Sequence, residues 1–129
     1  MSPHILIVED HQGVRQSLRE WLELSFPRYQ LLEAASGEEA VGMARTMPPS
    51  LVIMDIGLPG MTGIEATQGI KAAAPATLVV MLTIYDDEAH RTDAVAAGVS
   101  AYVPKRKVQT ELLPALTRLL AEDNGKPPS

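Results

Sequence analysis

Short aliphatic runs alternate with segments of helical period along the chain. The runs are continuous in their apolar character and do not alternate with polar residues, which is typical of strands buried on both faces of a sheet. The predicted strands cover residues 4–9, 51–55, 77–83 and 101–103, with a weaker one at about 29–34. Each strand is separated from the next by a segment long enough for a helix.

Apolar residues three or four positions apart predict a helix between each pair of strands and one after the last. Val14, Leu18 and Leu22 mark the buried face of the first helix, and Pro27 is its stop signal. Ser36 and Glu39 form an S-x-x-E capping box that opens the second helix, which continues to about residue 46. The third and fourth helices are predicted at about 63–73 and 87–97.

The last predicted helix carries a leucine face and one proline. Leu112, Leu116 and Leu120 lie on its apolar side. Proline has no N–H to donate, so Pro114 is expected in the first turn of this helix, which we therefore predict to open near Glu111.

Five strands alternating with five helices predict an α/β fold, in which helices cover both faces of a parallel sheet. A length of 129 residues corresponds to one domain. We assign the domain to residues 1–122. The polar segment 123–129 contains glycine and proline and is expected to be a loose tail or the start of a linker.

Composition excludes several kinds of function. The chain has 16 acidic and 11 basic residues, a net charge of −5, which argues against nucleic-acid binding by this segment alone. It contains no cysteine, so disulfides, thiolate metal sites and cysteine nucleophiles are excluded. No signal peptide or apolar run of about 20 residues is found, so we expect no membrane contact and a cytoplasmic location.

Charged and polar residues gather where the predicted strands end. Glu9 and Asp10 follow the first strand, Asp55 ends the third, Thr83 ends the fourth and Lys105 follows the fifth. Ligands of open α/β sheets bind beyond these carboxyl ends. Three crowded carboxylates need a compensating cation, and a site built from oxygen ligands favours Mg²⁺ together with the lysine ammonium.

Each of these residues alone has an ordinary structural explanation. Asp10 could be a helix cap, Thr83 could bond the backbone, and Lys105 could be a solvated charge. Their convergence on one edge of the sheet makes a functional site the better interpretation. His11 is expected to be a solvated loop histidine, because Mg²⁺ prefers oxygen ligands.

Four sequence elements in this order resemble the receiver domain of two-component response regulators. They are the pair Glu9-Asp10, the segment around Asp55, the segment that begins at Thr83, and Tyr102-Val-Pro-Lys105. The finer pattern is most similar to the NarL/FixJ-type subfamily. The resemblance implies a doubly wound, flavodoxin-like sheet with strand order 2-1-3-4-5.

The resemblance also implies a role for each residue of the site. Asp55 would accept a phosphoryl group from a histidine kinase, and Lys105 would neutralise charge on that group. Mg²⁺ would be held by Glu9, Asp10, Asp55 and the backbone carbonyl of Gly57.

The same resemblance implies a conformational switch. Thr83 would hydrogen-bond the phosphoryl group and Tyr102 would turn inward, which would change the surface of the fourth helix, fifth strand and last helix. The implied outputs are a homodimer on phosphorylation and transcription control. DNA would be bound only through a C-terminal output domain not present in this chain.

The sequence departs from the family pattern at three positions. Glu9 replaces a more frequent aspartate, Ile84 replaces a small residue and could narrow access to the acyl phosphate, and Ala101 replaces a frequent glycine.

Other functions remain as alternatives. An aspartyl phosphatase of the haloacid dehalogenase class would need a second aspartate where Gly57 stands, and in a flavodoxin-like carrier the Glu9-Asp10 pair would repel phosphate. The remaining alternatives are an unphosphorylated pseudo-receiver that only binds partners and a stand-alone receiver that acts by protein–protein contact. The favoured interpretation is a phospho-accepting signalling switch that assists its own phosphorylation and dephosphorylation, and not an enzyme that turns over a diffusible substrate.

Overall fold

In the computed structural model the chain folds around one parallel sheet, and residues 3–125 are described. The sheet has five strands in the order β2-β1-β3-β4-β5. The strands are β1 (His4–Val8), β2 (Gln30–Ala34), β3 (Leu51–Asp55), β4 (Leu78–Thr83) and β5 (Ala101–Pro104). This order confirms the predicted doubly wound α/β fold.

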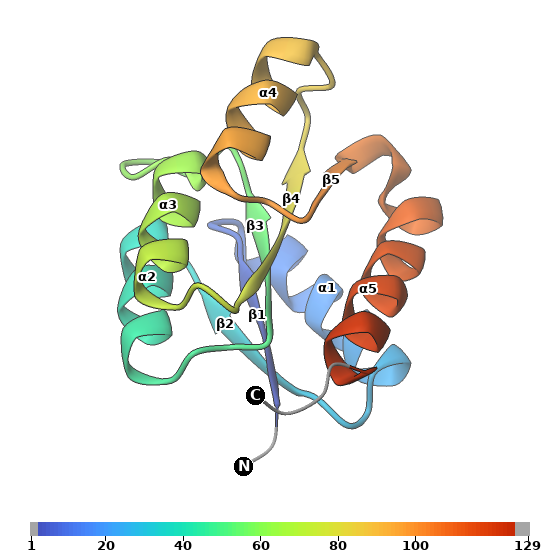
Figure 1. Cartoon of the computed structure of the whole chain (residues 1–129). Coiled ribbons are helices and arrows are strands. Elements are labelled where there is room, and N and C mark those ends of the chain that lie inside the picture. The colour runs from blue at the N-terminus through green and yellow to red at the C-terminus, as the bar shows by residue number, and fades with distance from the viewer. Residues whose placement is uncertain (1–2, 126–129) are drawn as a thin grey trace.

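Five α-helices cover both faces of the sheet. They are α1 (Gln12–Ser25), α2 (Gly37–Thr46), α3 (Gly63–Ala73), α4 (Glu88–Ala97) and α5 (Val108–Gly125), and a short 3₁₀ turn, η1 (Lys105–Lys107), precedes the last. Figure 1 shows α1 and α5 on one face of the sheet and α2, α3 and α4 on the other.

Alternate residues of each central strand supply the two cores. In β1, Ile5 and Ile7 pack with the leucines of α1 and α5, whereas Leu6 and Val8 pack with α2 and α3. All four are at most 1% exposed. Burial on both faces explains why the strands read as continuous aliphatic runs.

The helix starts largely follow the polar caps of the sequence. Ser36 accepts from the Glu39 N–H at 3.1 Å, which is the serine half of the predicted capping box. The complete, reciprocal box is at the start of α3, where Thr62 and Glu65 bond each other's backbone N–H at 3.1 Å in both directions. Gly98 ends α4 with a left-handed φ of 107°, which glycine adopts without strain.

The predicted place of Pro114 in the last helix is wrong. The chain passes from β5 through η1 directly into α5, so the helix begins at Val108 and Pro114 lies inside it. Pro114 and Thr110, whose carbonyl loses its helical donor, are both exposed, so water can solvate that carbonyl. The helix continues to Gly125, beyond the predicted boundary at residue 122, and residues 126–129 lie outside the described part of the chain.

Among residues 3–125, no helix has the length and apolar character needed to cross a membrane.

Candidate functional site

The sheet brings the predicted residues of the site to one edge. The strands β1, β3, β4 and β5 are parallel neighbours, so their carboxyl ends meet at the same end of the molecule, as Figure 1 shows. The Lys105 Nζ, just after β5, lies 3.3 Å from the Asp55 Oδ2 and 3.5 Å from the Glu9 Oε2. Lysine and two carboxylates from three strands are thus in direct contact.

The three carboxylates form one acidic cluster. Glu9, Asp10 and Asp55 each offer a ligand oxygen within 4.8 Å of the others. Glu9 and Asp55 are 4% and 6% exposed, whereas Asp10 is exposed to solvent. Burial, followed by the neighbouring Asp55 carboxyl, raises the pKa of Glu9, and Lys105 opposes this shift. Three carboxyl groups thus gather around one lysine.

The chemistry of the cluster suits a hard divalent cation. Its donors are carboxylate oxygens from the β1–α1 loop and from the end of β3, and one of the three faces solvent. Mg²⁺ binds through one or two carboxylates and retains waters, so a partly open cluster of oxygen ligands fits it.

Asp55 is held at both carboxylate oxygens. Its Oδ1 accepts from the Gly57 N–H at 3.0 Å, and its Oδ2 faces Lys105. The loop after β3 is also packed tightly against the start of α3, because a Cβ on Gly63 would lie 2.4 Å from the Asp55 carbonyl oxygen. The Gly57 contact uses its N–H, and the metal role of its carbonyl stays a prediction.

Thr83 is fully buried and already hydrogen-bonded. Its Oγ1 accepts from the Tyr85 N–H at 2.8 Å, and the Tyr102 hydroxyl donates to the Tyr85 carbonyl at 2.5 Å. Arg91 lies over the Tyr102 ring, 4.6 Å from its centroid. Tyr85 thus joins the two predicted switch residues, a role that no sequence signal indicated.

Two residues beside the acidic pair have structural roles that the sequence analysis did not assign. His11 is exposed and caps α1, because its Nδ1 accepts from the Val14 N–H at 3.2 Å. Arg15 donates from Nη1 to the Glu9 carbonyl at 2.8 Å. A polar residue before a helix could have identified the cap, whereas nothing in the sequence distinguishes Arg15 from other arginines on a helix.

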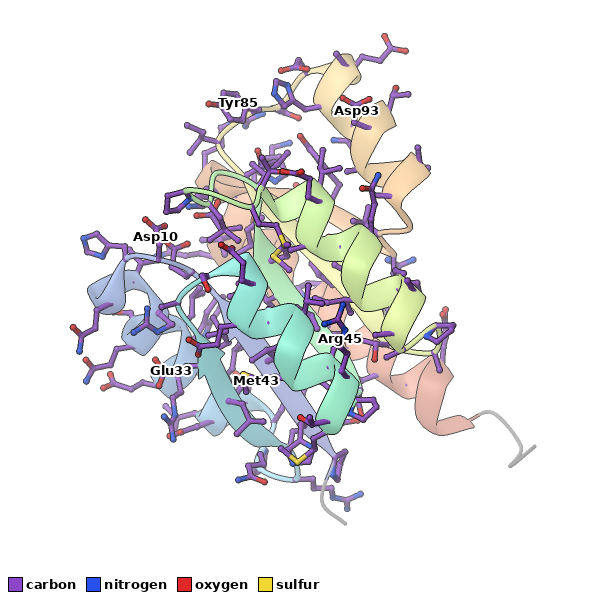
Figure 2. The ribbon with its side chains drawn as sticks, turned by 90° about the vertical axis from the view of Figure 1, so that its left-hand side faces the viewer. Asp10, Glu33, Met43, Arg45, Tyr85 and Asp93 are labelled. Atoms are coloured by element: carbon purple, nitrogen blue, oxygen red, sulfur yellow. The ribbon has the colours of Figure 1, made fainter. Side chains whose placement is uncertain are left out.

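The loop after β4 is exposed to solvent but is held by ion pairs and hydrogen bonds. The Ile84 side chain is 72% exposed beside Thr83, at the position where narrower access was predicted. The next charged residue, Asp86, pairs with Arg106 of η1 and lies 3.5 Å from Arg91. In Figure 2, Tyr85 of this loop lies above Asp10 in the left half of the view.

Known proteins are similar to this chain in both sequence and fold. Residues 5–117 match the response regulator receiver domain family. The response regulator protein VraR of Staphylococcus aureus is 32% identical over 118 residues, 92% of this chain. A LuxR-family two-component response regulator from Aurantimonas sp. SI85-9A1 has 36% identity and a TM-score of 0.86, covering 95% of this chain and 87% of that one.

The structure of a third similar protein contains bound ligands. TrrA of Thermotoga maritima, a response regulator in complex with Mg²⁺ and beryllofluoride, is 30% identical with a TM-score of 0.79, covering 91% of this chain and 98% of that one. The curated relatives are longer, since the chain spans 56% of VraR and 28% of another relative.

Proposed function

The chain belongs to the response regulator receiver domain family, and on this premise we propose that it is a signalling switch phosphorylated on Asp55. The observation that carries the proposal is the contact between Asp55 and Lys105, 3.3 Å apart inside the acidic cluster. A buried carboxylate between a fixed ammonium and two further carboxylates is arranged to become a nucleophile when its charge is compensated.

The proposed donor is a phosphohistidine of a histidine kinase. A carboxylate oxygen of Asp55 would attack phosphorus, the P–N bond would break, and the imidazole would leave with the bond's electron pair. Lys105 would stay beside the phosphoryl oxygens and offset their charge. The product is an acyl phosphate on the protein itself.

Mg²⁺ is the proposed cofactor. Glu9, Asp10, Asp55 and the carbonyl of Gly57 would hold it, and the bound ion would supply positive charge to the phosphoryl oxygens. The acidic cluster and the Mg²⁺ complex of TrrA support this assignment.

We propose that Thr83 and Tyr102 carry the switch through Tyr85. A phosphoryl group on Asp55 offers the Thr83 O–H a strong acceptor, and a hydroxyl drawn toward it would shift the bond that its oxygen now accepts from the Tyr85 N–H. The Tyr85 peptide would then be free to move, together with the Tyr102 hydroxyl bonded to its carbonyl. Phosphorylation would in this way change the surface of α4, β5 and α5.

The proposed output is transcription control from the cytoplasm. The similarity to a LuxR-family response regulator supports it. DNA would be bound by an output domain outside this chain, and phosphorylation would favour a homodimer. The acidic balance of the chain, −5 in net charge, supports leaving DNA contact to another domain.

Intact-mass measurement tests the phosphorylation site. Incubation with phosphoramidate and Mg²⁺ is expected to add one hydroxylamine-labile phosphate to the chain, and Asp55→Asn should gain none. Asp93→Asn, which removes an exposed carboxylate of α4, is the matched control and should gain one phosphate. Phosphate on Asp55→Asn would refute the assignment, and none on the wild type would leave a pseudo-receiver that only binds partners.

A further inference from the structure

A pair of charged side chains connects the acidic cluster to the outer strand of the sheet. Arg15 of α1 donates from Nη1 to the Glu9 carbonyl at 2.8 Å, and its Nε donates to the Glu33 Oε1 on β2 at 2.9 Å. The two side chains are 15% and 26% exposed. We call Arg15 and Glu33 the brace.

The brace acts on the backbone between the two adjacent acids. The carbonyl that Arg15 binds belongs to the peptide that joins Glu9 to Asp10, so both carboxylates project from residues flanking that peptide. The backbone N–H of Glu9, on the peptide before this one, donates to the Ala34 carbonyl at the end of β2, at 3.1 Å. The acidic pair is therefore tied to β2 twice, once directly and once through the brace.

Glu33 is well placed to fix Arg15, because it belongs to a strand that is hydrogen-bonded to β1. Glu33 pairs directly with Ile7 in the β1–β2 register, two residues before Glu9. Figure 2 shows Glu33 on β2 and Asp10 in the loop above it, on the same side of the molecule. The described contacts of Arg15 reach the Glu9 carbonyl and the Glu33 carboxylate, not the carboxylates that would hold a cation.

We propose that Arg15 is a positioning residue, which sets the orientation of the Glu9–Asp10 peptide and so the affinity of the cluster for Mg²⁺. The proposal rests on the proposed function for the identity of the cation. Arg15 lies on α1 and not at a strand end. It would act on Mg²⁺ binding through the Glu9 backbone carbonyl, without touching the ion.

A positioning role for Arg15 and a purely electrostatic role predict opposite changes in Mg²⁺ affinity when the side chain is removed. Removing a cation near a dication site lowers Coulomb repulsion and so tightens Mg²⁺ binding. Removing a group that orients the ligands weakens Mg²⁺ binding, since the loop must then be ordered at the cost of binding energy. The sign of the change in affinity separates the two effects.

The experiment is a Mg²⁺ titration by calorimetry without a phosphodonor. Arg15→Met keeps most of the aliphatic stem and removes every donor, and its Kd is expected to rise about tenfold, the scale for groups that orient metal ligands. Arg15→Lys keeps the charge, so its expected rise of about threefold would report geometry alone.

Arg19→Met is the matched control. Arg19 binds the same Glu33, at 2.7 Å, and also Glu23, at 2.8 Å, but neither contact reaches the acidic pair. Its Kd is expected to stay within about twofold of the wild type, on the scale of a surface ion pair. In an Arg15→Met background, Glu33→Gln should weaken Mg²⁺ binding no further, because Glu33 acts through Arg15.

An unchanged or lower Kd in both Arg15 variants would overturn the proposal, and circular dichroism would verify that each variant is folded. If Arg15→Met does not fold, Arg15→Lys decides alone. The phosphorylation assay separates this inference from the proposed function. A wild type that binds Mg²⁺ with the expected variant effects but gains no phosphate would refute only the function, and a wild type that binds no Mg²⁺ would refute both.

Discussion

The Tyr102 hydroxyl and the Tyr85 carbonyl are joined by a 2.5 Å hydrogen bond between β5 and the loop after β4. The same Tyr85 donates its N–H to the buried Thr83 hydroxyl at 2.8 Å. One residue thus connects the hydroxyl at the end of β4 with an aromatic ring on the next strand. The Thr83 oxygen accepts this bond, so its O–H proton is available to a phosphoryl oxygen, and a shift of the hydroxyl toward Asp55 would be passed on to the Tyr85 peptide.

Replacing Thr83 should uncouple the ring from the phosphorylation site. Beryllofluoride, which mimics a phosphoryl group on a carboxylate, is expected to shift NMR signals of the wild type from Asp55 through residues 86–106. In Thr83→Ala the analogue should still bind, but the change at Tyr102 should shrink several-fold, because the hydroxyl that links the phosphoryl site to the Tyr85 N–H is gone.

Thr117→Ala is the control for this experiment, because Thr117 is exposed on α5. It should leave the spread of the NMR shifts unchanged. If the wild-type shifts stay confined to the loops around Asp10 and Asp55, the domain binds the analogue without switching, and the proposed mechanism is wrong.

The two adjacent acids should contribute unequally to Mg²⁺ binding. Glu9 is buried, accepts from the His11 N–H at 3.3 Å and lies near Lys105, so protein groups already offset part of its charge. Asp10 is exposed and its charge is available to the ion. Asp10→Asn is therefore expected to raise the Kd for Mg²⁺ about tenfold and Glu9→Gln only about threefold, within the range for changes at a metal site.

Calorimetric titration of the two variants checks this difference. Both substitutions remove one formal charge and retain the side-chain volume, so the long-range electrostatic effect is matched. Equal effects, or a larger effect from Glu9→Gln, would contradict the unequal roles.

Much of the fold and site follows from the sequence because it depends on local pattern and on topology. Aliphatic runs predict buried strands wherever they occur, and a parallel sheet necessarily brings the residues after its strands to one edge. Asp55, Thr83 and Lys105 were located in this way, and their mutual placement needed no knowledge of any side-chain contact.

The contacts that sequence analysis missed join residues through side-chain geometry. Arg15 binds a backbone carbonyl, and its partner Glu33 is 18 residues away along the chain, at a spacing with no periodic signature. Tyr85 acts through its peptide groups, which every residue possesses. Pro114 was misplaced because local rules give the cost of a proline in a helix but not its exposure, which decides whether water can satisfy the freed carbonyl.

The glycine at the start of α3 should be essential to the loop that carries Asp55. A Cβ on Gly63 would lie 2.4 Å from the Asp55 carbonyl oxygen and 2.7 Å from the Ile56 Cα, and both are backbone atoms that cannot rotate away. Gly63→Ala is expected to lower the free energy of unfolding by about 2–3 kcal/mol, the cost of overpacking a tight contact.

Gly42→Ala provides the matched control, measured with Gly63→Ala by urea unfolding. Gly42 is in α2, and a Cβ there would meet nothing within 4 Å. Alanine favours helix over glycine, so this variant should gain about 0.5–1 kcal/mol. A neutral Gly63→Ala would mean that the loop can move aside without cost.

The ion pairs of Glu33 should make stability depend on pH in acid. Hydrogen bonds from Arg19 and then Arg15 lower the pKa of Glu33, so the folded state prefers its carboxylate form more than the unfolded state does. Its contribution to stability is therefore full at neutral pH and is lost as the pH falls from the ordinary glutamate value of about 4.3 through the lowered pKa. Glu33→Gln is expected to cost about 1 kcal/mol at pH 7, at the upper end for a partly exposed pair.

Urea unfolding at pH 7, 5 and 3 measures this dependence. The difference between wild type and Glu33→Gln should be nearly the same at pH 7 and pH 5 and should shrink at pH 3, because there the unfolded state binds a proton on Glu33 more readily than the folded state does. Glu111→Gln is the control, because Glu111 contacts only Lys107 among its described ion pairs, at 3.5 Å and 45% exposed, and should change stability by less than about 0.5 kcal/mol. A difference that is constant or larger at pH 3 would show that Glu33 stabilises the fold through packing, since packing does not depend on the charge of the carboxylate.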